Sequence, residues 1–396
     1  MELENNKFTR RSMLKSTILS SAVIAPILSF PLLGQAEELK DKTIPAGKDD
    51  QFTEEEEFPS FKFRFRDSPK RTYPEGWARE ATVKQFPVSK GLAGVDMYLN
   101  PGAARELHWH AIAAEWGYIL EGAVRITTID PEGKSETTDC GKGDIFYFPK
   151  GYGHSIQAFD QGSHFILIFD SGYFSEFGTF SVTDWVAHTP EAVIAASTGL
   201  PSKLFAGLPD QEKYMVPGKV PAPLKLDPDE DVSDSPLTHK FRFTSQNPIF
   251  KSAGGSVKVA SAVEFPISKT ITGVLEIIKP NAVRELHWHP NADEWQYYIS
   301  GKGRMTVFGS SGRARTDDFE ATDVGYVPQG YGHYIENTGE EDLVVLIGLN
   351  SGKYEDISLS DWIATNTNEL VADHFNGTAA DYSNKPKGKI IIGLKA

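Results

Sequence analysis

The chain has 396 residues, of which 40% are hydrophobic and 24% are charged, and its formal net charge is -14. This length predicts two globular domains of about 150 to 180 residues each, because longer chains divide their hydrophobic core between domains. The acidic balance argues against a nucleic-acid-binding protein, since a phosphate-binding surface needs clustered lysines and arginines.

The first 36 residues are predicted to be an export signal and not part of the fold. Arg10 and Arg11 precede a short apolar run that ends near Gly34-Gln35-Ala36, an order typical of a twin-arginine signal peptide and its cleavage site. The alternative is a membrane anchor, but the apolar run is short for a bilayer span and contains two prolines. We therefore expect export to the periplasm or the extracellular space, with no stable membrane anchor after signal removal. Residues 37–59 would form an acidic N-terminal extension.

The remainder of the chain is an internal duplication. The sequence RELHWH occurs at Arg105–His110 and, unchanged, at Arg284–His289, and the flanking residues align without gaps at the same offset. A repeat this long indicates two whole domains and not a solenoid. We predict a first domain at residues 60–207, a Pro- and Asp-rich linker at 208–235, and a second domain at 236–396.

The predicted elements of each half are short strands rich in Val, Ile, Tyr and Phe, separated by Gly, Pro and Asp turns. This spacing is typical of an all-β sandwich or barrel. The predicted strands include Trp116–Leu120, Ala123–Ile129, Asp144–Phe148, Trp295–Ile299 and Arg304–Phe308. Helical patterns are confined to the ends of the halves, at Glu191–Ala196 and Asp361–Leu370. We expect two β-barrels with small helical appendages.

Each half carries four candidate metal ligands. His108 and His110 are two residues apart, so on a strand they point to the same face, which we predict to be the barrel interior. Glu115 follows after a short turn, and His154 comes from a later strand. The second half repeats the set as His287, His289, Glu294 and His333. A lone His-x-His pair would be read as two ordinary histidines, but recurrence of the whole set predicts a metal site in each half. Ligand type alone leaves Mn, Fe, Ni, Cu and Zn open.

These residues belong to two motifs that resemble those of the cupin superfamily. In the first half the motifs are Gly102, His108, His110, Glu115 and Gly122, then Gly143, Pro149, Gly151 and His154. The second half matches both motifs, except that Asn281 and Thr322 replace the leading glycines.

More specifically, the chain resembles the bicupin oxalate decarboxylases. The resemblance rests on RELHWH, on Asp293–Gly301 and on Thr183-Asp184-Trp185, and it covers nearly the whole mature chain. It implies two tandem cupin barrels of the double-stranded β-helix or jelly-roll type, with two Mn(II) ions per chain. It also implies oxalate as the substrate, formate and carbon dioxide as products, and dioxygen as a catalytic co-substrate. Proteins of this kind commonly assemble into trimers or hexamers.

Arg105 and Arg284 each stand three residues before the first histidine of a set. On a regular strand this odd spacing would turn the arginine away from the histidines, so a bend or bulge would be needed to bring it inward. A surface or interdomain salt bridge is the alternative role. By the resemblance, both arginines hold a carboxylate of oxalate, a task suited to the planar guanidinium group.

The halves differ after the second motif, where the segment beginning at Ser171 is three residues longer than the one beginning at Ser351. Neutral loop variation is one interpretation. In oxalate decarboxylases this segment is a lid over the N-terminal metal, reads Ser-Glu-Asn-Ser, and carries the acid. Glu176 matches that acid, whereas Phe177 and Gly178 replace the Asn-Ser, a change that could alter how the lid closes. The resemblance also predicts a glutamate on Leu343–Leu349, but this segment contains none, which argues against decarboxylation in the second half.

The main hypothesis is an Mn(II)-dependent oxalate decarboxylase that acts at the N-terminal site, with Arg105 binding the substrate and Glu176 donating the proton. The enzymatic alternative is an oxalate oxidase, which yields carbon dioxide and hydrogen peroxide. A manganese-binding or storage cupin of the cell envelope is an alternative from another class, because folding before export would let Mn bind ahead of Cu or Zn. The retained acid and arginines favour catalysis, since storage needs neither.

Overall fold

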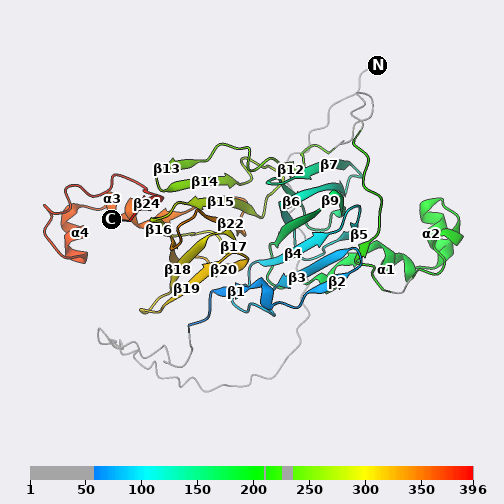
Figure 1. Cartoon of the computed structure of the whole chain (residues 1–396), viewed down its shortest axis with the longest axis horizontal. Helices are drawn as coiled ribbons and strands as arrows, with labels where there is room; N and C mark the ends of the chain where they lie inside the picture. Colours follow the sequence, from blue (N-terminus) through cyan, green and yellow to red (C-terminus); the bar gives the residue numbers. More distant parts are fainter. Residues whose placement is uncertain (1–57, 209–210, 225–234, 396) are drawn as a thin grey trace, which may run out of the picture. The chain divides into compact units, whose positions relative to one another are not determined.

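The computed structural model describes residues 58–208, 211–224 and 235–395. The predicted export signal and nearly all of the predicted acidic extension lie outside these residues. The described chain is built mainly from antiparallel strands, with helices only near the end of each half (Figure 1). The predicted all-β fold with two tandem barrels is confirmed. No helix of the described residues has both the length and the apolar character needed to cross a membrane.

The first barrel is one continuous sheet in which the order β8-β6-β9-β4-β3-β2 is extended by β5, β7, β10 and β11. Its strands are β2 (Arg71–Tyr73), β3 (Gly76–Ala81), β4 (Ala93–Leu99), β5 (Ala104–Trp109), β6 (Glu115–Ile129), β7 (Ser135–Gly141), β8 (Ile145–Phe148), β9 (Gly153–Phe169), β10 (Phe180–Ser181) and β11 (Met215–Val216). The predicted strands Trp116–Leu120 and Ala123–Ile129 are therefore parts of the single strand β6. Their pairing with β9 shifts register around Gly122, whose positive φ of 72° bends the strand without ending it.

The second barrel consists of two separate sheets, because the strands corresponding to β6 and β9 are each interrupted. Its strands are β13 (Phe250–Ser252), β14 (Gly255–Ala260), β15 (Thr272–Ile278), β16 (Ala282–Trp288), β17 (Glu294–Ser300), β18 (Lys302–Phe308), β19 (Ala314–Glu320), β20 (Asp323–Val327), β21 (Gly332–Asn337), β22 (Leu343–Leu349), β23 (Ile357–Ser358) and β24 (Ile392–Leu394). One sheet has the order β20-β17-β22-β15-β14-β13, and the other has β19-β18-β21-β16-β23 with β24 beside β16.

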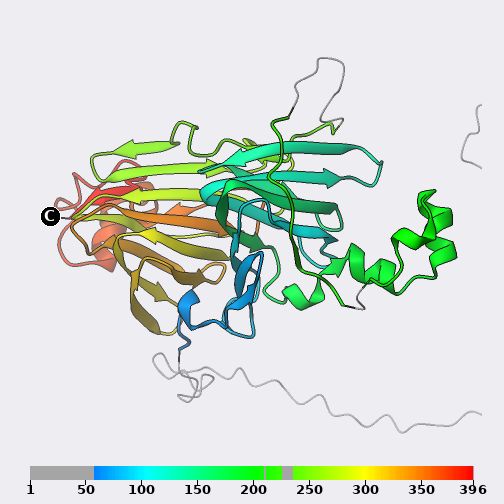
Figure 2. The same cartoon turned by 45° about the vertical axis from the view of Figure 1, so that its right-hand side comes forward.

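The two halves exchange their first strands. β1 (Lys62–Arg64) pairs with β20 of the second barrel, and β12 (Lys240–Phe241) pairs with β8 of the first. Figure 2 shows the blue start of the described chain beside the yellow strands of the second half. The predicted first domain, 60–207, thus contains a strand that belongs to the other barrel. This reciprocal pairing covers the outer edges of β20 and β8 and ties the barrels together.

Three clusters of buried apolar side chains form the core. One lies in the first barrel, one in the second, and the third combines residues of both halves. In this third cluster Trp116 packs against Gly273, and Trp295 packs against Gly94. A Cβ atom at Gly273 would lie 2.4 Å from the Trp116 ring, so the close approach of the barrels requires glycine there.

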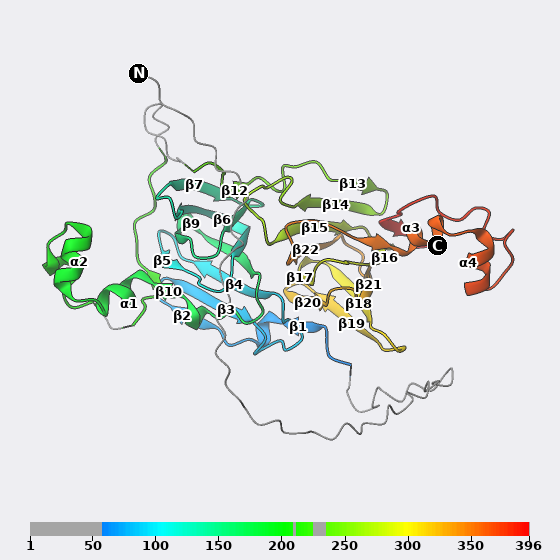
Figure 3. The same cartoon turned by 180° about the vertical axis from the view of Figure 1, so that it is seen from behind.

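Each half carries one helical appendage outside its barrel (Figures 1 and 3). The first half carries α1 (Val182–Ala187) and α2 (Glu191–Thr198), and the second carries α3 (Leu359–Thr365) and α4 (Asn368–His374). The predicted helix at Asp361–Leu370 is therefore two helices. The break comes at Thr367, whose side chain caps α4 by accepting a hydrogen bond from the backbone N–H of Leu370 at 3.2 Å. Single 3-10 turns occur at η1 (Phe65–Asp67), η2 (Glu176–Gly178) and η3 (Ser202–Leu204).

Candidate metal and substrate sites

The strand that carries RELHWH bends between the arginine and the first histidine. Arg105 pairs with Ile156 and His108 with His154, and the register between β5 and β9 shifts between these two pairs. The same shift separates Arg284 from His287 on β16. Because of this bulge, Arg105 and His108 are both buried in the barrel, although they are an odd number of residues apart. The predicted bulge is confirmed in both halves.

The structure brings the four candidate ligands of each half together. In the first half His108 lies on β5, His110 directly after it, Glu115 at the start of β6 and His154 at the start of β9. Their ligand atoms all lie within 4.8 Å of one another, and all four side chains are buried. The same description holds for the second set, His287, His289, Glu294 and His333.

The chemistry of the first set fits a divalent cation. The Nδ1 atoms of His108 and His154 lie 2.5 and 2.9 Å from backbone carbonyl oxygens, so Nδ1–H donates and Nε2 keeps its lone pair for a metal. The Nε2 atoms of His110 and His154 lie 2.9 and 3.1 Å from Oε2 of Glu115. The other carboxylate oxygen of Glu115, Oε1, is buried and has no hydrogen-bond partner. A cation bound at this point would take up the lone pairs of the histidine Nε2 atoms and would give Oε1 of Glu115 a partner.

The protonation states favour the same interpretation. Burial lowers the pKa of His108 well below its ordinary value, so its imidazole is neutral, as a metal ligand must be. Burial alone would raise the pKa of Glu115, but His154 and His110 lower it to about 2. The carboxylate is therefore charged at any physiological pH. In the second half Glu294 has its pKa lowered well below the ordinary value by the corresponding histidines, against the effect of burial.

A buried ion pair lies beside the first metal set. The NH2 atom of Arg105 lies 3.4 Å from Oε2 of Glu176, and both side chains are almost completely buried. Arg105 also donates from NH1 to the backbone oxygen of Tyr214 at 2.7 Å, and its guanidinium lies 4.0 Å from the Tyr214 ring centroid. The structure thus places the two residues predicted to act on the substrate next to each other.

Glu176 lies in the 3-10 turn η2, and Glu80 supports this turn through a hydrogen bond. The backbone N–H of Glu176 donates to Oε2 of Glu80 at 3.2 Å, and NH2 of Arg71 lies 3.6 Å from the same oxygen. At the corresponding positions the second half has Val259 and Phe250. The polar pair Arg71 and Glu80 therefore occurs in the half with the longer segment, and apolar residues replace it in the half with the shorter one.

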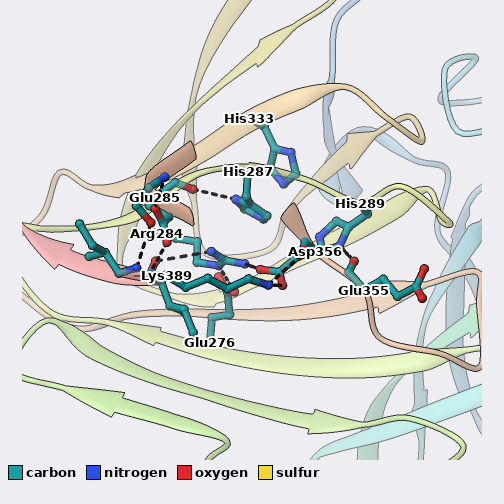
Figure 4. Close-up of polar contacts among 12 residues, drawn as sticks. Glu276, Arg284, Glu285, His287, His289, His333, Glu355, Asp356 and Lys389 are labelled. Carbon is teal, nitrogen blue, oxygen red and sulfur yellow. Dashed lines mark hydrogen bonds and ion pairs between the residues drawn. The ribbon is translucent and has the colours of Figure 1, made fainter. Parts of the chain in front are cut away.

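The arginine of the second set has different partners (Figure 4). Arg284 pairs through Nε with Oε1 of Glu276 at 3.0 Å and through NH2 with Oδ2 of Asp356 at 2.8 Å. Lys389 also contacts Asp356, with Nζ 2.6 Å from Oδ1. The segment β22 contains no acid, as the sequence indicated, but Arg284 has a buried glutamate partner from another strand. Glu276 reaches it from β15, the strand next to β22.

Four residues near the arginines were missed by sequence reasoning. Glu80 and Glu276 could have been found, because each is an acid at a strand position where the other half has an apolar residue, Val259 and Met97 respectively. Asp356 and Tyr214 give no such signal. Tyr214 lies inside the predicted linker, yet β11 directly after it pairs with β5, so this part of the linker belongs to the first barrel.

The glutamate of RELHWH has a structural role in both halves. Glu106 accepts the backbone N–H of Tyr214 at 2.8 Å, and Glu285 accepts that of Ile391. Each glutamate thereby attaches the last strand of its half to the strand that carries the histidines. Tyr214 and Ile391 share a left-handed backbone, with φ of 61° and 62°, which directs their carbonyl oxygens toward the arginine.

Comparison with known proteins agrees with this geometry. The cupin family model matches residues 65–204 and 241–381. The chain is 48% identical over 318 residues to oxalate decarboxylase OxdC of Bacillus subtilis strain 168, covering 80% of this chain and 82% of that one. It is 36% identical over 321 residues to a probable oxalate decarboxylase of Arthroderma benhamiae, covering 80% and 79%.

Solved structures show the same likeness. The structure of Bacillus subtilis oxalate decarboxylase at pH 4.6 superposes with a TM-score of 0.81 at 45% identity, covering 86% of this chain and 89% of that one. Another structure of that protein, with a TM-score of 0.81 and 45% identity over 86% and 90% of the chains, is described as having Mn(II) centres. The two His/Glu sets of the present chain fit two such ions. The chain belongs to the bicupin oxalate decarboxylase family of the cupin superfamily.

Proposed function

We propose that this protein converts oxalate to formate and carbon dioxide at the first metal set, with Mn(II) bound there and dioxygen as a catalytic co-substrate. The reaction consumes one proton for each oxalate dianion. The proposal is supported by family membership and, above all, by one observation: a buried glutamate, Glu176, is in contact with a buried arginine, Arg105, beside the four candidate ligands.

Each of these residues has a task in the proposed reaction. His108, His110, Glu115 and His154 would hold the metal. When bound, Mn(II) supplies a Lewis acid for the oxalate oxygens and, with dioxygen, reversible one-electron chemistry. Arg105 binds the carboxylate of oxalate that is not lost, and its position between Tyr214 and Glu176 orients the guanidinium.

Glu176 holds the proton that ends on the carbon atom of formate. A carboxylic acid on a short turn can approach the substrate and then exchange its proton with solvent, which an acid fixed in a strand cannot do. Burial of the Glu176 side chain also keeps water away from its carboxyl group during the reaction. The arginine of the second half is already held by two carboxylates, Glu276 and Asp356, and this contrast supports the first half as the catalytic one.

The test is an assay of formate and hydrogen peroxide from oxalate, at mildly acidic pH, on protein whose manganese content has been measured. Formate as the main product, without matching peroxide, is the expected result. Peroxide with little formate would replace the proposal by an oxalate oxidase. Two bound Mn(II) ions without any turnover would replace it by a manganese-binding or storage protein of the cell envelope.

We further propose that the protein is exported by the twin-arginine route to the periplasm or beyond, and that it forms a homo-oligomer of the trimer or hexamer kind. The first proposal rests on Arg10, Arg11 and the apolar run that follows. The second is supported by the large apolar side chains that the helical appendages expose, among them Trp185 and Trp362, which are 64% and 57% exposed. Cell fractionation and sedimentation velocity of the purified protein test these two proposals.

A further inference from the structure

We propose that Asp356 determines the specificity of the second metal set: its carboxylate occupies the position on Arg284 that a small dicarboxylate such as oxalate would take, and so excludes that anion. Asp356 would thus be an internal competitor for the substrate. This inference rests on the proposed function only in the choice of oxalate as the ligand.

The first argument is the occupancy of the guanidinium. All three nitrogen atoms of Arg284 have partners: Nε faces Glu276 at 3.0 Å, NH2 faces Asp356 at 2.8 Å, and NH1 faces the backbone oxygen of Ile391 at 3.5 Å. Among the residues that the structure describes, Arg105 of the first half has an ion pair with one carboxylate, and that pair is longer, at 3.4 Å. A substrate carboxylate therefore meets much stronger competition at Arg284.

The second argument is that Asp356 is held in place and charged. Its Oδ1 atom lies 2.6 Å from Nζ of Lys389, which also donates to its backbone oxygen at 2.8 Å. Burial by itself would raise the pKa of Asp356, but Arg284 and Lys389 keep it below its ordinary value. Figure 4 shows the Asp356 carboxylate in contact with both the Arg284 guanidinium and the Lys389 ammonium group.

The third argument is the position of Asp356 between Arg284 and solvent. Asp356 and Lys389 line a cavity of about 590 Å³, together with Tyr354, Ile391 and other residues. Arg284 itself is completely buried behind them. The neighbouring residue, Glu355, accepts a hydrogen bond from Nδ1 of His289 at 2.7 Å through its backbone oxygen. Asp356 lines the cavity whereas Arg284 does not, so an anion in the cavity meets the Asp356 carboxylate before the guanidinium.

The test measures oxalate binding when Asp356 loses its charge. All proteins carry Arg105→Gln, which removes the guanidinium of the first half, and all are loaded with Mn(II). Oxalate is titrated without dioxygen by calorimetry, and the EPR spectrum of bound Mn(II) is recorded at each step. We expect Asp356→Asn to strengthen binding at the second set by roughly ten- to a hundredfold, the affinity that one charge-assisted hydrogen bond supplies. Adding Arg284→Gln should abolish this gain.

Glu355→Gln is the matched control, because Glu355 is the adjacent acid of the same cavity but pairs with the exposed Lys353. It should leave oxalate affinity unchanged. The inference is overturned if Asp356→Asn retains two Mn(II) per chain and shows no gain. It is also overturned if the second set of the protein that keeps Asp356 binds oxalate as tightly as that of the Asp356→Asn variant. Asp356→Ser serves as a second variant if the amide destabilises the fold. Absence of oxalate turnover by the unmodified protein would contradict the proposed function instead, so the two failures are distinct.

Discussion

Replacement of Glu176 by glutamine would remove the proposed proton donor while keeping the shape of the side chain. A positioned general acid contributes roughly 10² to 10⁴ in rate, which corresponds to about 3 to 5 kcal/mol of activation free energy. The expected result is a fall of that size in the rate of formate production. The share of oxalate that ends as carbon dioxide and peroxide should rise, because the proton needed for formate is missing.

The protein should still fold and bind metal after this change. The Arg105–Glu176 contact is long, at 3.4 Å, and Arg105 keeps its 2.7 Å hydrogen bond to Tyr214 and its contact with the Tyr214 ring. We therefore expect a loss of about 1 to 2 kcal/mol in the free energy of unfolding, small beside the roughly 5 to 15 kcal/mol of a typical domain. Glu176 does not belong to the four-ligand set, so manganese content should not change.

The assay measures formate, peroxide and manganese on the same samples of the unmodified protein and of two variants. Glu276→Gln is the matched comparison, because it removes the buried carboxylate from the arginine of the second half. Formate production should stay within about twofold of normal in that variant. A Glu176→Gln protein that makes formate within tenfold of the normal rate, with full metal content, would refute the assignment of Glu176. A larger loss in Glu276→Gln would place the reaction in the second half.

Two further predictions concern stability. Gly273→Ala should lower the free energy of unfolding by about 1 to 3 kcal/mol, because the new Cβ would lie 2.4 Å from the Trp116 ring. Guanidinium denaturation measures this loss. The control is Gly141→Ala, whose Cβ meets nothing within 4 Å and which should change the free energy of unfolding by less than about 0.5 kcal/mol. Burial raises the pKa of Glu212 to about 7 from its ordinary value of 4.5, so between these pH values the folded protein binds more protons at this group than the unfolded chain does. The stabilising effect of the protonated form is therefore lost as pH rises through 7, and Glu212→Gln should gain stability relative to the unmodified protein between pH 5 and pH 8. Parallel pH curves for the two proteins would contradict this.

The duplication, the barrel class and the two four-residue sets could be predicted from the sequence because each depends on short-range spacing. Residues i and i+2 of a strand share a face, so a His-x-His pair followed by a glutamate specifies nearly a whole ligand set by itself. The longer segment with Glu176 was visible because the two halves can be aligned with each other. The inward turn of Arg105 and Arg284 required a bulge, and the need for it followed from the odd spacing alone.

Other features depend on which strands become neighbours, and only the tertiary structure decided them. Asp356 reaches Arg284 from a segment 72 residues later, and Tyr214 covers Arg105 because a segment about a hundred residues later adds a strand to β5. The exchange of β1 and β12 between the barrels likewise depends on sheet order. Strand pairing between distant segments leaves no fixed spacing in the chain, since its register is chosen by the packing of whole faces. The two copies of RELHWH are therefore identical in sequence, while the partners of their arginines, Glu176 in one half and Glu276 with Asp356 in the other, were determined by the folded chain.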